Sequence, residues 1–342
     1  MEDNLKPTGR EQPNRVGTPS RAVVTGAGGF IGSHLVDALL DQGWPTLALV
    51  RYVSDGSAGF LNKKLDTSGL EIARGDVRDP DFLNAHIREA DIVFHLAALI
   101  SIPYSYEAPR DCIETNVIGT LNVLEACRQA KVRRLVHTST SEVFGTAIYV
   151  PIDEKHPIQA QSPYAASKHA ADKLVQSYVC SFSVPAVTIR PFNTFGPRQS
   201  SRAVISTIIQ QALGTGRIRL GNLTPRRDFT FVADTVTGFI AAAKAEDKAL
   251  GMEINLGTGR DVSIEEIAKM IRDAIDPGIP IESDSARLRP EASEVLRLRS
   301  DNRLARDLLG WSPQISLEEG ITQTIRWMRD CGQHDLWRGY AI

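Results

Sequence analysis

The chain has 342 residues, with 39 lysines and arginines against 41 aspartates and glutamates, a formal net charge of −2 and 42% hydrophobic residues. This balance argues against a protein that binds nucleic acid or a membrane surface through bulk charge. The four cysteines are widely spaced, so neither a disulfide framework nor a metal site is expected, and no apolar run is long enough to span a bilayer. A soluble, cytoplasmic protein is predicted, with residues 1–20 as a mobile tail because they carry almost no large apolar side chains.

After this tail, short β-branched runs alternate with longer amphipathic segments. Such alternation predicts an α/β fold, with a doubly wound parallel sheet and helices on both faces. This domain is expected over 21–190, and 229–258 is expected to return to it. Loops rich in Pro, Gly and Arg follow residue 190, and they predict a smaller carboxy-terminal lobe built from 191–228 and 259–335.

The first predicted strand and helix are joined by the glycine-rich stretch TGAGGFIG. In a dinucleotide site of the Rossmann type, the first Gly makes a tight turn, the second lets backbone approach the pyrophosphate, and the third lets helix and strand pack closely. The strand and helix context suits such a site. Gly26, Gly29 and Gly32, with Phe30 and Ile31 between them, are therefore predicted to bind a dinucleotide.

The second and third predicted strands end where the adenosine part of a dinucleotide would lie. An acidic residue at the end of the second strand would hold the ribose 2′-hydroxyl of NAD, but Arg51 stands there, with Ser54 nearby. An Arg suits the 2′-phosphate of NADP, although it could also be a solvated surface residue, so the choice of cofactor stays open. Asp76, in GDVRD with Val77, could accept a hydrogen bond from the adenine amino group.

The apolar run RLVHTS continues into the polar stretch STSEVFG, whose side chains need hydrogen-bond partners if they are buried. Further along, YAASK places Tyr164 and Lys168 four residues apart, on one face of a helix expected over 163–182. Both stretches are expected at the carboxyl edge of the sheet, where ligands bind in doubly wound folds. A lysine ammonium beside a phenol lowers the pKa of the phenol, which makes Tyr164 a plausible base.

Taken together, GAGGFIG, GDVRD, HLAA, STSEVFG, YAASK, RPFNTFGPR, RRDFTFV and LLGWSPQISLEEGI resemble the extended short-chain dehydrogenase/reductase family, in its NDP-sugar epimerase and dehydratase branch. The resemblance covers about 21–330 and is strongest to the NDP-hexosamine 4,6-dehydratases. It implies an enzyme with tightly bound NAD or NADP that is recycled in each turnover, and a UDP- or GDP-linked hexosamine as substrate. It also implies cofactor contacts from Leu96, Ala97 and Ala98 in HLAA and from the YAASK pair.

The resemblance further implies a role for each polar group. Thr140 would bond the sugar 4-oxygen, Tyr164 would take the proton of that hydroxyl, and Lys168 would hold the nicotinamide ribose. The resulting 4-ketone acidifies the hydrogen on C5, which Glu142 could remove before water leaves from C6. Glucose-type dehydratases carry an Asp where this chain has Ser141, and a Ser does not easily donate a proton at neutral pH. Either Glu142 acts as base and then as acid, or Ser141 relays a proton.

By the same resemblance, Asn193, Arg202, Arg227 and Arg289 would contact the substrate from the second lobe. Guanidinium groups suit a diphosphate, because they bind phosphate oxygens bidentately.

The resemblance also implies a homodimer, in which the helices expected over 111–131 and 163–182 pack against their copies as a four-helix bundle.

Three other activities of the branch stay open: an NDP-glucuronate decarboxylase, an NDP-sugar 4-epimerase and a dehydratase that stops at the 5,6-ene. From a different class, a non-catalytic dinucleotide-sensing regulator would be expected to lose the Tyr164 and Lys168 pair that this chain keeps.

Overall fold

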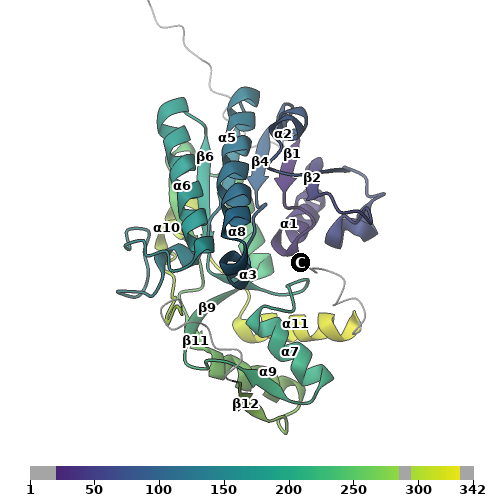
Figure 1. The fold of residues 1–342 in the computed structure, drawn as a ribbon, viewed down its shortest axis with the longest axis vertical. Coiled ribbons are helices and arrows are strands. Elements are labelled where there is room, and N and C mark those ends of the chain that lie inside the picture. Colours follow the sequence, from purple (N-terminus) through teal and green to yellow (C-terminus); the bar gives the residue numbers. More distant parts are fainter. Residues whose placement is uncertain (1–20, 285–293, 332–342) are drawn as a thin grey trace, which may run out of the picture.

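A seven-stranded parallel sheet forms the centre of the structure, a computed structural model that describes residues 21–284 and 294–331 (Figure 1). Its strand order is β10-β6-β5-β4-β1-β2-β3. The strands are β1 (Ala22–Thr25), β2 (Thr46–Arg51), β3 (Leu70–Gly75), β4 (Ile92–His95), β5 (Arg134–Thr138), β6 (Ala186–Pro191) and β10 (Glu253–Leu256). The order reverses between β1 and β4, which opens a crevice at their carboxyl ends. The predicted doubly wound α/β fold is confirmed.

Helices cover both faces of this sheet, because each helix has one apolar side and the central strands are buried on both faces. Helices α1 and α8 lie on one face, and α2, α5 and α6 lie on the other (Figure 1). Their bounds are α1 (Phe30–Asp41), α2 (Pro80–Ile87), α5 (Gly119–Ala130), α6 (Pro163–Phe182) and α8 (Val232–Lys244). Short 3-10 helices complete this part of the chain: η1 (Gly59–Lys64), η3 (Ser141–Phe144) and η4 (Asp247–Ala249).

The helix expected over 111–131 is interrupted in the structure. After α3 (Ile102–Glu107), the chain forms α4 (Pro109–Ile113), then a π-helical turn, η2 (Glu114–Ile118), and then α5. The turn brings in Asn116, whose buried amide bonds the backbone N–H and C=O of Leu99 at 2.8 and 3.0 Å. A buried amide needs such partners, and the wider π turn lets it reach them.

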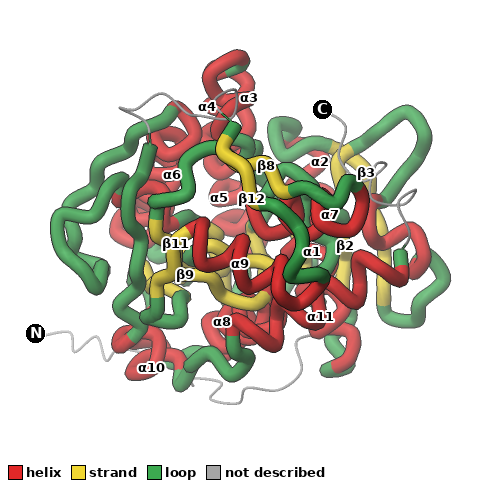
Figure 2. The backbone as a smooth tube through the Cα atoms, turned by 90° about the horizontal axis from the view of Figure 1, so that it is seen from below, coloured by secondary structure: helices red, strands yellow, loops and turns green. Residues whose placement is uncertain are grey.

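Among the described residues, the second lobe holds two small sheets and three helices, seen from below in Figure 2. Three strands form one sheet in the order β11-β9-β7, and two form the other. The elements are β7 (Asn193–Phe195), β8 (Ile218–Leu220), β9 (Arg226–Phe231), β11 (Asp261–Ser263), β12 (Ile281–Ser283), α7 (Val204–Gly214), α9 (Ile264–Ile275) and α11 (Leu317–Asp330). Helix α10 (Arg303–Leu309) lies beside α8 and β10. Of the segment 229–258, residues Phe229–Phe231 belong to β9 in the small sheet, whereas α8 and β10 join the large one.

A large apolar cluster connects the two lobes. It runs from one face of the large sheet into the second lobe, and it includes Val24, Leu35, Phe239, Phe195, Phe229, Ile267 and Ile321. Burial of each large apolar side chain stabilises the fold by about 1.5–3 kcal/mol. The cluster therefore fixes the second lobe against the edge of the sheet at which the candidate site lies.

Candidate active site

The carboxyl ends of β1, β4 and β5 lie side by side, and the chain leaves them through three stretches that carry most of the predicted site residues. Thr25, the last residue of β1, joins two of these stretches. Its hydroxyl oxygen accepts hydrogen bonds from the backbone N–H groups of Leu96 (3.2 Å) and Ala97 (3.1 Å), and it lies 2.8 Å from Nδ1 of His95. The glycine-rich turn after β1 and the segment 96–98 after β4 are therefore held as one unit.

The turn after β1 leaves no room for a side chain at Gly26 or Gly32. Gly26 has a φ of +69°, and a Cβ there would lie 2.8 Å from the backbone nitrogen of Ala97. A Cβ on Gly32 would collide with the carbonyl oxygen of Gly26. No side chain caps α1 after Gly29, while Phe30 packs against the core, as Ile31 does. Bare backbone at an uncapped helix start is what a dinucleotide pyrophosphate needs, so these residues fit a bound NAD or NADP.

At the ends of β2 and β3, the predicted adenosine contacts differ in their surroundings. Arg51 and Ser54 are exposed, and no side chain pairs with the Arg51 guanidinium within the described residues. Asp76 instead pairs with Arg78, with Nη2 and Oδ2 2.7 Å apart, and this guanidinium lowers the pKa of the Asp76 carboxyl. Val77 is buried against Gly119 of α5. Asp76 thus carries a partner, Arg78, that the sequence patterns did not reveal.

The polar stretch after β5 forms a tight turn over residues 139–145, called the catalytic turn below because it carries the candidate catalytic residues. Thr140 caps the short helix η3, and its hydroxyl accepts a hydrogen bond from the Glu142 backbone N–H at 3.3 Å. Ser141 is buried and Glu142 is half-buried, while Val143 and Phe144 anchor the turn in a small apolar cluster. The turn ends at Gly145, whose φ of +61° suits a glycine. It therefore presents Thr140 and Glu142 from a backbone fixed on both sides.

Helix α6 brings Tyr164 and Lys168 to this turn. Ser162 caps the helix by accepting a hydrogen bond from the Ala165 N–H at 3.1 Å, so Tyr164 lies in the first turn. Tyr164 and Lys168 are only 7% and 3% exposed, although both are polar. The Tyr164 phenol lies close enough to the Thr140 side chain and the Glu142 carboxylate for both groups to affect its pKa. The structure thus brings Thr140, Glu142, Tyr164 and Lys168 together.

Burial governs the charge of the Tyr164 and Lys168 pair. Burial raises the pKa of Tyr164, and Glu142 and Asp172 raise it further, while the Thr140 side chain opposes them. Burial lowers the pKa of Lys168 to about 8, against the opposing effect of Asp172. The lowered phenol pKa expected from the sequence is therefore not found, because desolvation and two nearby carboxylates act in the other direction.

Sequence reasoning missed a buried polar cluster directly behind this pair. Asp172, one helical turn beyond Lys168, accepts hydrogen bonds from Ser139 Oγ at 2.6 Å and Arg190 Nη2 at 3.0 Å. Its other oxygen lies 3.3 Å from Nε2 of His137. Two signals were present in the sequence: polar residues at 164, 168 and 172 repeat every helical turn, and an arginine interrupts the apolar run AVTIRP.

The second lobe presents some of the predicted substrate contacts. The side-chain oxygen of Asn193 on β7 is buried and makes no hydrogen bond within residues 21–284 and 294–331, so it is available to a ligand. Arg227 on β9 is buried, with Nη2 3.5 Å from Oε1 of Glu294. Arg202 is exposed in the loop before α7, and Arg289 lies outside the described residues. Their contacts with a substrate remain predictions.

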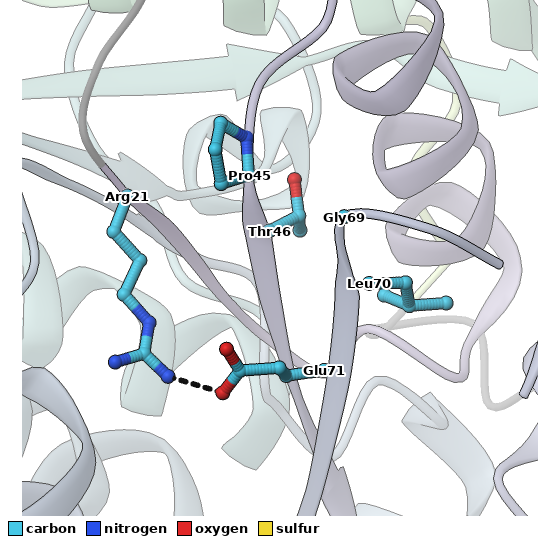
Figure 3. Close-up of a pocket in the computed structure, with 6 residues that line it drawn as sticks. All are labelled: Arg21, Pro45, Thr46, Gly69, Leu70 and Glu71. Atoms are coloured by element: carbon cyan, nitrogen blue, oxygen red, sulfur yellow. Dashed lines mark hydrogen bonds and ion pairs between the residues drawn. The ribbon is translucent and has the colours of Figure 1, made fainter. Parts of the chain in front are cut away.

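A hollow of about 230 Å³ opens at the opposite edge of the sheet (Figure 3). It lies at the amino ends of β1, β2 and β3, where Arg21 Nη2 pairs with Glu71 Oε2 at 2.6 Å. None of the candidate site residues lines it. Across the described part of the chain, no cluster of His, Cys, Asp or Glu is arranged to hold a metal, and no helix there has both the length and the apolar character to cross a membrane.

Comparison with known proteins identifies the chain's relatives. A family model described as GDP-mannose 4,6 dehydratase matches residues 23–324. The chain is 36% identical to a UDP-glucose 4-epimerase of Mycolicibacterium smegmatis, over 92% of this chain and 100% of the relative. It is 33% identical to UDP-glucuronic acid decarboxylase 2 of Arabidopsis thaliana, over 90% of this chain and 67% of the relative. Different reactions thus occur among relatives of similar identity.

A solved structure supports the cofactor prediction. The dTDP-glucose 4,6-dehydratase DesIV of Streptomyces venezuelae, with NAD bound, superposes with a TM-score of 0.83 at 28% identity. The match covers 93% of this chain and 99% of DesIV. The similarity extends over both lobes, so it concerns the whole architecture that surrounds the site.

The charge of buried Lys168 generates a prediction for stability against pH. A folded-state pKa of about 8, below the ordinary 10.5, means that the unfolded chain binds more protons between these values. Stability should therefore rise with pH in this window. We expect the unfolding free energy of the wild type, minus that of Lys168→Met, to increase by about 2 kcal/mol from pH 7.5 to pH 9.5, as measured by urea denaturation. A difference that stays constant over this range would show that Lys168 has an ordinary pKa.

Proposed function

This chain belongs to the NAD-dependent NDP-sugar epimerase/dehydratase family of short-chain dehydrogenases/reductases, and we propose that it is a 4,6-dehydratase acting on an N-acetylhexosamine nucleotide. The observation that carries the proposal is the Glu142 carboxylate, placed in the same turn as Thr140 and close enough to affect the Tyr164 phenol. A hydroxyl, a phenol and a carboxylate around one point supply what oxidation and elimination each require. The hexosamine is proposed because STSEVFG and YAASK resemble the NDP-hexosamine dehydratases.

The first step is oxidation of the sugar at C4. Thr140 holds the 4-hydroxyl, and Tyr164 removes its proton while the hydride leaves C4. Lys168, buried one helical turn after Tyr164, stabilises the phenolate form that acts as this base and that becomes a neutral phenol as it takes the proton, and it would hold the nicotinamide ribose. When bound, NAD or NADP would supply the hydride acceptor, and the backbone of the turn from Gly26 to Gly32 would hold it.

The second step is elimination of water across C5 and C6. The 4-ketone makes the C5 hydrogen acidic, and Glu142 removes it as a proton. The C6 hydroxyl then leaves with a proton from the same carboxyl group, because the neighbouring Ser141 is a poor acid at neutral pH. Hydride from the reduced cofactor would then return to C6, and a proton from solvent would be added at C5 while Tyr164 gives up the proton that it took from the 4-hydroxyl, so the sugar loses one water with no net change in the cofactor. A 5,6-ene-forming enzyme would share the proton removal and omit the return of hydride to C6.

Glu142 favours a dehydratase over a 4-epimerase. A 4-epimerase needs only the C4 oxidation and its reversal from the other face, so it has no use for a carboxylate beside C5. A glucuronate decarboxylase shares the STSEV pattern, Glu142 included, and differs in that it also needs a cation for the substrate carboxylate. The position of Glu142 therefore favours removal of the C5 proton.

The two steps predict different defects for the two residues that carry them. Tyr164→Phe removes the base for oxidation, so turnover should fall by a factor on the order of 10²–10⁴ and no reduced cofactor should accumulate. Glu142→Gln should still oxidise C4 but stop before elimination. Its near-ultraviolet absorbance from reduced nicotinamide should rise when substrate is added and should not decay. Normal turnover by Glu142→Gln, or accumulation of reduced cofactor in Tyr164→Phe, would show that these roles are wrong.

Arg51 is proposed to contact the adenosine ribose of the cofactor or its 2′-phosphate, since it is exposed at the end of β2. Arg51→Ala should weaken retention of NADP about tenfold, as expected for loss of one charge-assisted hydrogen bond. The cofactor released by denaturation identifies the form bound, and titration of stripped enzyme gives its affinity. Arg88→Ala is the control, because Arg88 is 73% exposed and pairs only with neighbouring Glu89 among the described residues. The proposal fails if NAD alone is released and Arg51→Ala binds it as the wild type does.

A homodimer through α5 and α6 is also proposed. Leu124 packs in the core, but Ile113 and Ile118, just before α5, are 41% and 43% exposed, and Leu121 of α5 is half-buried. An apolar strip of this kind on adjoining helices suits packing against a second copy. Ile118→Glu should convert the dimer to a monomer in light scattering at micromolar concentration. Leu65→Glu, at an exposed apolar residue after η1, should not. A monomeric wild type would rule the dimer out.

A further inference from the structure

We propose that Asp172 and Arg190 are positioning residues, which hold the catalytic turn in register with Tyr164 and Lys168 and set the charge of that pair. Neither residue belongs to the groups assigned above to the sugar or the cofactor. The proposal rests on the proposed function only through the C4 oxidation step, which the family's epimerases and dehydratases share. Its test can therefore fail or succeed whatever the final product is.

Asp172 connects helix α6 to the start of the catalytic turn. It lies two helical turns after Tyr164 and one after Lys168, and its side chain is fully buried. Its Oδ2 accepts the hydrogen bond from Ser139, the residue immediately before Thr140. The backbone N–H of Ser139 is in turn bonded to the Ile189 carbonyl of β6 at 2.7 Å. A shift of α6 along the sheet would therefore break a buried charged hydrogen bond.

Arg190 supports the far end of the same turn. Its side chain is fully buried, and its Nη2 donates to Asp172 at 3.0 Å and lies 2.8 Å from Oε2 of Glu253 on β10. The guanidinium also lies over the Phe144 ring, 5.2 Å from the ring centroid. Phe144 follows Glu142 by two residues. The Asp172 and Arg190 pair thus contacts the catalytic turn at two residues: Ser139, which precedes Thr140, and Phe144, which follows Glu142.

Stability alone does not account for such a pair. Burying two charged groups costs desolvation free energy, and the attraction between the groups often does no more than offset this cost. Apolar residues of similar size commonly stabilise a fold as much or more. What apolar residues cannot supply is directional bonds to Ser139 and a fixed negative charge behind Lys168 and Tyr164. We therefore assign the pair to geometry and charge at the site.

Several charged or titratable groups surround Asp172, and removal of its charge would change the pKa values of those close to it. His137 of β5 and Arg190 of β6 contact it, and Glu253 of β10 reaches it through Arg190. The other groups around the cluster are Lys168, His169 and Lys173 of α6, His95 of β4 and Cys112 of α4. Because the Asp172 charge raises the pKa of both Tyr164 and Lys168, its loss should move both titrations to lower pH.

The decisive variant is Asp172→Asn in the enzyme with its nicotinamide cofactor bound. Glu253 still pairs with Arg190 in this variant, so the buried guanidinium keeps a counter-charge. The pKa of Lys168, followed by NMR of ¹³C-labelled lysine and assigned with Lys168→Met, should fall by about one unit. The rate of cofactor reduction should fall at least about tenfold, and its optimum should move to lower pH. The probes are UDP- and GDP-linked glucose and N-acetylglucosamine, whichever reduces the wild-type cofactor.

Asp234→Asn is the matched control. Asp234 is a buried carboxylate of α8 that accepts a hydrogen bond from the Ile315 N–H at 2.9 Å, so its loss should affect stability without moving the Lys168 titration. If Asp172→Asn does not fold, Ser139→Ala and Phe144→Leu each remove one contact between the pair and the turn, and each should slow cofactor reduction. An unchanged Lys168 titration in Asp172→Asn, or unchanged reduction rates in Ser139→Ala and Phe144→Leu, would overturn the proposal.

Discussion

Burial of Tyr164 and Lys168 against the end of β5 is the contact around which the rest of the site is arranged. Because both lie on the closed face of α6, their protonation depends on neighbouring groups more than on water. Those neighbours are the Thr140 hydroxyl and the carboxylates of Glu142 and Asp172. Small changes in nearby charge, such as those that accompany binding of a substrate or cofactor, therefore move the pKa of both groups.

The strand order reverses between β1 and β4, and this reversal places two further parts of the site beside Tyr164 and Lys168. On one side, the glycine turn after β1 brings bare backbone to the position where a pyrophosphate would lie. On the other, the apolar cluster shared by the two lobes fixes β7 and β9, with Asn193 and Arg227, against the same edge. The site is thus assembled from strand ends and one helix, whose relative positions are set by the core.

Local patterns predicted the parts of the structure that depend on local spacing. The glycine turn and the placement of Tyr164 and Lys168 on one face of α6 both follow from residues a few positions apart. What the sequence could not show depends on contacts across long separations. The Asp172 and Arg190 pair joins a helix to a strand. The π turn lets the Asn116 amide form hydrogen bonds with the backbone N–H and C=O of Leu99. The raised phenol pKa likewise arises from burial, which spacing does not report.

Mass spectrometry and NMR of the reaction product test the dehydratase assignment most directly. The purified protein would be incubated with UDP- and GDP-linked N-acetylglucosamine and glucose, in water and in heavy water. A 4,6-dehydratase gives a keto-sugar nucleotide lighter than its substrate by one water, with a methyl group at C6 and solvent deuterium at C5. A product isomeric with its substrate and inverted at C4, with no loss of water, would contradict the assignment and identify a 4-epimerase.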